Sequence, residues 1–83
     1  MSRQETKQLA KESTKLRELK YDFTNLHTLC QSLKSNYHHY SAADIRAVER
    51  LLKRLDLKIE DLRVRIKDQE TRVYGLQVSL DSD

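Results

Sequence analysis

Apolar residues recur in steps of three and four along the second half of the chain, from Ile45 to Leu80. In a seven-residue repeat labelled a to g, these residues occupy positions a and d. Position a is Ile45, Leu52, Ile59, Ile66, Val73 and Leu80, and position d is Val48, Leu55, Leu62, Gln69 and Leu76. A stripe that repeats every 3.5 residues is buried only against another helix, in a left-handed coiled coil. The pattern predicts a helix over 42–79, and we call its a and d positions, with those of the first half, the seam.

The first half of the chain keeps the same repeat and predicts a helix over 4–36. Its a positions are Leu9, Leu16, Phe23, Cys30 and Tyr37, and its d positions are Glu12, Leu19, Leu26, Leu33 and Tyr40. Glu12 is the one charged residue in this row. Two helices with complementary stripes can bury them against each other within one chain.

Between the two halves the repeat loses its phase. Tyr40 and Ile45 are five residues apart where the heptad requires four. Ser41 is a favourable N-cap, and Asp44 follows it three residues later, as in a capping box. We therefore predict a turn over 37–41 and an all-α fold: an antiparallel two-helix coiled-coil hairpin, with residues 1–83 forming a single helical domain. The alternative is one long continuous coiled-coil helix of about 120 Å, at 1.5 Å per residue.

A hairpin with this turn opposes residues whose numbers sum to 85. The register pairs Tyr37 with Val48, Leu33 with Leu52, Cys30 with Leu55 and Leu26 with Ile59. Among the charges that flank the seam, Lys15 and Arg72 come near each other as a repulsive pair, and the register brings Glu12 and Gln69 into the seam at the end away from the turn. We expect that end to be weaker and more hydrated. Gln69 is either a tolerated polar residue or one that selects the register or the partner.

The second helix carries more apolar residues than the seam needs. A row of positions seven apart on the side opposite the seam contains Ala43, Leu57, Val64 and Val78, with Arg50 and Thr71 at its other places, and Leu51 widens the seam at its edge. We expect this side to bind another helix, either of a second copy or of a partner coiled-coil protein, and two paired hairpins would form a four-helix bundle. The predicted partner-binding residues are Leu51, Leu57, Val64, Tyr74 and Val78.

Composition indicates a binding protein and not an enzyme. Charged residues make up 35% of the 83 residues and hydrophobic residues 37%, with one glycine and no proline. No nucleophile has a base partner at a suitable spacing, and no glycine-rich phosphate loop is present. His27 and Cys30 share a helix face, but a cysteine in the seam more often packs as a small hydrophobe than binds a metal. We therefore predict no catalytic residue, cofactor, metal or small-molecule substrate.

One lone cysteine is typical of a reducing compartment, and no apolar run approaches the length of a membrane span. The polar start of the sequence does not resemble a signal peptide. We therefore expect an intracellular protein, cytoplasmic or nuclear, without membrane contact. Its expected function is that of a non-enzymatic interaction and oligomerisation module, acting as a coiled-coil scaffold or assembly subunit.

A basic helical bundle that binds RNA or DNA is the alternative function. The formal net charge is +3, and Lys7, Lys11 and Lys15 step by four along one helix face. Tyr37 and His38 at the turn could stack on bases. Acidic residues interleave with the basic ones, however, which is typical of a solvated helix surface.

Overall fold

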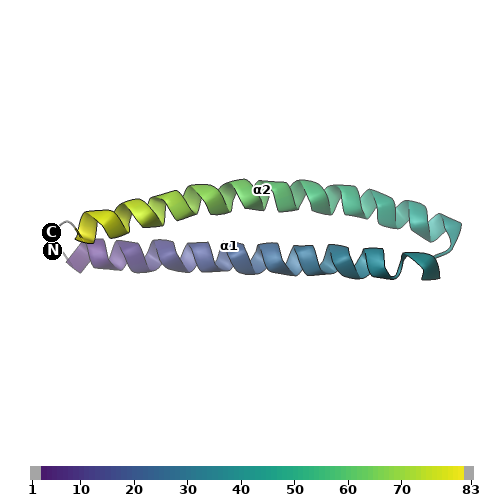
Figure 1. Cartoon of the computed structure of the whole chain (residues 1–83), viewed down its shortest axis with the longest axis horizontal. Helices are drawn as coiled ribbons and strands as arrows, with labels where there is room; N and C mark the ends of the chain where they lie inside the picture. The colour runs from purple at the N-terminus through teal and green to yellow at the C-terminus, as the bar shows by residue number, and fades with distance from the viewer. Residues whose placement is uncertain (1–2, 82–83) are drawn as a thin grey trace.

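The computed structural model describes residues 3–81, which form two long antiparallel helices joined by a short turn (Figure 1). Helix α1 spans Arg3–Ser35, a 3₁₀ turn η1 spans Tyr37–His39, and α2 spans Ala42–Asp81. The molecule measures 61 × 15 × 15 Å, as expected for a 40-residue helix at about 1.5 Å per residue. The predicted all-α hairpin is confirmed, and the alternative of one continuous helix is wrong.

The turn reverses the chain without a left-handed residue. Asn36 ends α1 with φ −96° and ψ 11°, and Tyr40 has extended backbone with φ −91° and ψ 145°. The His39 N–H donates to the Asn36 carbonyl (2.9 Å), and the Tyr40 N–H donates to the Tyr37 carbonyl (3.3 Å). No residue between 3 and 81 has a positive φ. A tight 3₁₀ segment therefore replaces the glycine that often ends a helix.

Ser41 caps the start of α2, as the sequence predicts. The Asp44 N–H donates to Ser41 Oγ (3.3 Å), and the Ile45 N–H donates to the Ser41 carbonyl (2.9 Å). The rings of Tyr37 and Tyr40 meet edge to face, with centroids 6.5 Å apart, and both residues are half-buried at the end of the seam. These contacts fix the angle at which α2 leaves the turn.

Every a and d position of the described residues is buried or half-buried along the interface of α1 and α2. The most tightly packed part surrounds Cys30, Leu55 and Ile59, each less than a tenth exposed. Phe23, Leu26, Leu33 and Leu52 pack against these three residues. Cys30 and Leu55 are opposed in the predicted register, and they belong to the same buried cluster.

Contacts that polar groups make across the two helices are close to the same register. The Arg63 guanidinium lies over the Phe23 ring, 5.9 Å from its centroid. The Tyr37 hydroxyl donates to Glu49. Both pairs have numbers that sum to 86, one more than the predicted 85, because residues beside the seam reach diagonally across it.

Candidate functional site

The five predicted partner-binding residues are all exposed on α2. Leu57 and Val64 are 74% and 54% exposed, Tyr74 is 70% exposed, and Leu51 and Val78 are a little under half exposed. Their exposure follows from helix geometry, since seven residues make close to two turns and keep Leu57 and Val64 on one side. The α1–α2 seam is complete without them. They are therefore surface residues of the single chain.

The structure brings only part of this set together. Leu57 and Val64 lie about 10 Å apart along α2, at 1.5 Å per residue, whereas Val78 lies about 21 Å beyond Val64. Leu51 is at the edge of the seam, and Tyr74 is turned away from the Leu57 row by about a quarter of a helical turn. Leu57 and Val64 with the polar residues beside them form the surface that we call the outer face of α2. Leu51, Tyr74 and Val78 are separate apolar positions.

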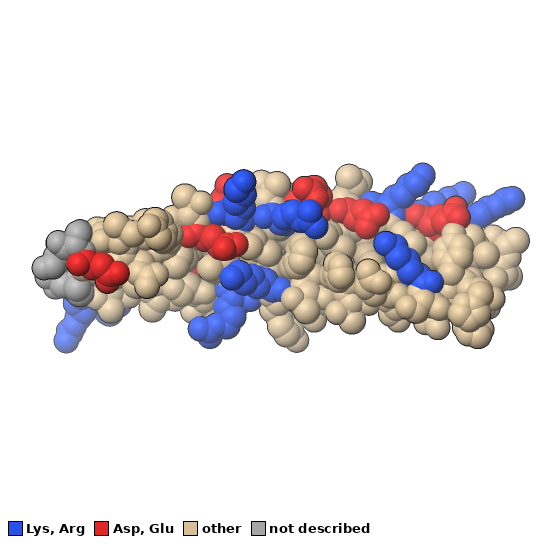
Figure 2. Space-filling view, viewed as in Figure 1, with Lys and Arg blue, Asp and Glu red and all other residues tan. Residues whose placement is uncertain are grey.

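The residues of the nucleic-acid alternative lie at opposite ends of the hairpin. Lys7, Lys11 and Lys15 are near the termini, and Tyr37 and His38 are at the turn. Lys15 and Tyr37 are 22 positions apart, which separates them by about 33 Å along the molecule. Figure 2 shows acidic and basic side chains mixed along the visible face. A single basic, aromatic surface for RNA or DNA is not assembled.

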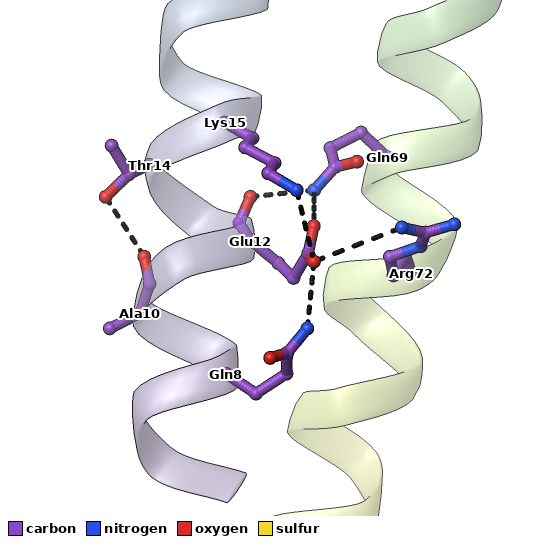
Figure 3. Close-up of polar contacts among 7 residues, drawn as sticks. All are labelled: Gln8, Ala10, Glu12, Thr14, Lys15, Gln69 and Arg72. Carbon is purple, nitrogen blue, oxygen red and sulfur yellow. Dashed lines mark hydrogen bonds and ion pairs between the residues drawn. The ribbon is translucent and has the colours of Figure 1, made fainter. Parts of the chain in front are cut away.

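The most elaborate polar cluster surrounds Glu12, which is only 2% exposed. The Gln69 amide nitrogen donates to Glu12 Oε2 (2.6 Å) and to the Glu12 carbonyl (2.9 Å), so it connects α2 to α1 twice. The Gln8 amide nitrogen donates to Glu12 Oε1 (2.9 Å). Figure 3 shows the Glu12 side chain pointing between the helices toward Gln69. The carboxylate therefore enters the seam with its hydrogen bonds supplied from both helices.

Two cations complete the cluster from the solvent side. Lys15 Nζ lies 3.6 Å from Glu12 Oε1, and Arg72 Nη1 lies 3.9 Å from the same oxygen. The repulsion predicted between Lys15 and Arg72 is therefore offset by a carboxylate between them. Burying a carboxylate without such partners would be strongly destabilising.

The hydrogen bond from Gln69 is the main cause that lowers the pKa of Glu12 below its ordinary value of 4.5; burial opposes this effect, and Lys15 and Arg72 reinforce it. Within residues 3–81, no buried side-chain nitrogen or oxygen lacks a hydrogen-bond partner. The expectation of a hydrated end is therefore wrong at Glu12, because side chains of both helices satisfy this buried carboxylate in place of water.

The Glu12–Gln69 contact was not predicted, although the sequence carries a signal for it. The register opposes Gln69 to Leu16 and Glu12 to Val73, so neither polar residue has a polar neighbour directly across the seam. Antiparallel side chains also reach one turn along the partner helix, and Gln69 does so. Two polar residues in the seam, with the like-charged pair Lys15 and Arg72 beside them, indicate a polar cluster at this end of the hairpin.

The residues considered for metal binding have structural positions. Cys30 is 3% exposed and packs with Leu55 and Ile59, and the His27 ring stacks on Phe23. His38 and His39 are adjacent at the turn, with ring centroids 4.0 Å apart. No group of three or more His, Cys, Asp or Glu residues suited to a metal ion occurs in the described part of the chain.

Neither α1 nor α2, over residues 3–81, has an apolar stretch long enough to cross a membrane. Comparison of the chain with models of known protein families, with curated proteins and with solved structures gives no match.

Proposed function

We propose that this hairpin is a non-enzymatic association module, a coiled-coil scaffold or assembly subunit that binds another helix through the outer face of α2. The observation that carries the proposal is the exposure of Leu57 and Val64, one heptad apart, on the side of α2 away from α1. A two-helix coiled coil needs its a and d positions only, and the remaining positions are ordinarily polar.

Helix-on-helix packing is the contact that suits this surface. Leu57 and Val64 are separated by a whole heptad, which is the spacing that a partner helix offers in return. Flanking charged side chains on α2 would form a polar rim around this short apolar contact.

Replacement of both residues by glutamate tests the proposal. The variant Leu57→Glu/Val64→Glu should lose association while keeping its helix content, because two carboxylates would have to be desolvated at the contact. A matched control is Thr24→Glu/Thr28→Glu, which adds the same charge at exposed positions of α1. Both variants lower the net charge from +3 by two, to +1.

Light scattering over a concentration series reports the mass of each variant, and circular dichroism reports its helix content. The single-chain mass is 9.9 kDa. If the wild type stays at that mass, the same variants are compared in capture of helical partners. Association that persists in Leu57→Glu/Val64→Glu, at the level of the control, would show that the outer face of α2 is not the binding surface.

A further inference from the structure

We propose that the occupant of the outer face of α2 is a second copy of this chain, bound antiparallel with its twofold axis beside Leu57. This inference rests on the proposed function and specifies its partner, orientation and register. Its basis is the order of charges along α2. At 100° per residue, the exposed charged residues within about 60° of Leu57 are Arg46, Arg50, Lys53, Arg54, Glu60, Asp61, Asp68 and Arg72.

The charges on the outer face change sign at Leu57. All four charged residues between the turn and Leu57 are basic, and the nearest three beyond it are acidic. The fourth, Arg72, is directed toward Glu12 of α1. On the face seen in Figure 2, basic side chains project from the turn end of α2. A parallel copy would oppose basic to basic and acidic to acidic, whereas an antiparallel copy opposes unlike charges. Antiparallel packing also opposes the helix dipoles favourably.

The same charges select one register. With the twofold axis beside Leu57, Lys53 lies next to Glu60 of the second copy, and Arg54 lies next to Asp61 of the second copy. Symmetry repeats both pairs. Leu57 then packs against Leu57 of the second copy, and Val64 packs on the aliphatic stem of the second copy's Arg50.

Neighbouring registers bring like charges together. If the twofold axis is moved half a heptad toward Val64, Glu60 opposes Glu60 of the second copy and Asp61 opposes Asp61 of the second copy. Lys53 then lies beside Lys67 of the second copy. An axis half a heptad toward the turn opposes Lys53 to Lys53 and Arg54 to Arg54. Exposed ion pairs add little affinity, but like charges in contact exclude these alternatives.

The acidic residues are free to form these new pairs. Glu60 contacts Arg63 at 3.8 Å and Asp61 contacts Arg65 at 3.0 Å, both within α2. The two carboxylates are 65% and 59% exposed in these pairs, so each has oxygen lone pairs open to a further donor. A single helix face is smaller than a standard interface, whose affinities begin in the micromolar range, so we expect a dissociation constant on the order of 10 μM or weaker.

Cysteine cross-linking tests the register. In a Cys30→Ala background, Leu57→Cys should form a disulfide-linked dimer in a glutathione redox buffer, because the twofold axis brings the two positions together. Val64→Cys is the matched control. In the proposed register its two copies are 14 positions apart, about 21 Å, and should remain unlinked. A parallel dimer would link both variants about equally.

Charge reversal gives an independent test. Lys53→Glu/Arg54→Glu should weaken self-association at least tenfold, and adding Glu60→Lys/Asp61→Lys to the same chain should restore it, because every pair is then reversed. Light scattering from about 1 μM to 1 mM measures both effects around the expected dissociation constant. Restoration by the fourfold variant excludes simple misfolding as the cause of the loss.

The results that would contradict the antiparallel dimer differ from those that would contradict the proposed association function. A wild type that stays at 9.9 kDa throughout the series would overturn self-association. Self-association with linking at Val64→Cys, or without linking at Leu57→Cys, would overturn the register while the association function stands. Only association that is insensitive to Leu57→Glu/Val64→Glu would overturn both.

Discussion

Leu55 and Leu57 are two positions apart on α2 and differ in environment, which makes their truncation a sharp test of the fold. Leu55 is 7% exposed in the core, and Leu57 is 74% exposed. Leucine to alanine removes three carbons, at about 0.8 kcal/mol for each when fully buried, or about 2.4 kcal/mol in all. Scaled by the buried fraction, the loss is about 2.2 kcal/mol for Leu55→Ala and about 0.6 kcal/mol for Leu57→Ala.

Two further effects widen the difference. The cavity left by Leu55→Ala raises its cost to about 2–4 kcal/mol. The higher helix propensity of alanine reduces the cost of Leu57→Ala to about 0.5 kcal/mol or less. A domain of this size has a free energy of unfolding of about 4–12 kcal/mol, so Leu55→Ala removes a large part of it.

Urea unfolding followed by circular dichroism measures this difference. With a slope near 1 kcal/mol per molar urea, Leu55→Ala should lower the midpoint by about 2 M or more, and Leu57→Ala by about 0.5 M or less. The protein is held at about 2 μM, below the dissociation constant expected for a small interface. Equal midpoints for the two variants would refute the assignment of Leu55 to the core and Leu57 to the surface.

Three further predictions concern Glu12, Gln69 and Ser41. Because the folded-state pKa of Glu12 lies below 4.5, its stabilising contribution is present above about pH 4.5 and is lost as the pH falls through the folded-state pKa. Glu12→Gln should therefore reduce the acid loss of stability in thermal unfolding between pH 5 and 2; an unchanged pH profile would contradict this. Gln69→Leu should lower the urea midpoint by removing the donor to a buried carboxylate, and Glu12→Leu/Gln69→Leu should recover it; failure to recover would mean that the polar pair is not the cause. Ser41→Ala should cost about 1 kcal/mol in urea unfolding and Ser41→Asp little, since aspartate also caps; equal losses would refute the N-cap.

The seam and the turn could be predicted because each rests on a repeating or local signal. The heptads place Cys30 and Leu55 in the seam, and the extra residue between Tyr40 and Ile45 marks the reversal. Once the turn is located, the register of two straight helices has no remaining freedom. This is why the packing of Cys30 against Leu55 follows from numbering alone.

The polar cluster could not be derived in the same way. In the heptad pattern Glu12 and Gln69 are only interruptions of the apolar row. The pattern shows which side of a helix a residue occupies, but it does not show how far the side chain reaches. Gln69 bonds to Glu12 one helical turn away from the residue directly opposite. That outcome depends on side-chain length and on the donors available, which are properties of the assembled pair of helices.

Surface charges were even less predictable. The hairpin places Arg65 and Asp22 near each other as flanking charges beside the seam, yet the Arg65 Nε lies 3.0 Å from Asp61 on α2. Exposed pairs are worth only about 0.2–1 kcal/mol, so small local differences decide which one forms. The outer face of α2 was partly predictable. The sequence indicates its apolar row, and the structure separates Leu57 and Val64 from Leu51 and Tyr74.

The hairpin topology also determines how the molecule would respond to a pulling force. The start of α1 and the end of α2 lie at the same end of the molecule (Figure 1), and the turn lies at the other. Tension applied at that end to both helices would separate them sequentially, one pair of seam positions after another. It would not load the whole seam in shear at the same time. Glu12 and Gln69 lie nearer the ends than the Cys30–Leu55 core. The buried carboxylate and its amide partner would therefore meet the load before the apolar core does.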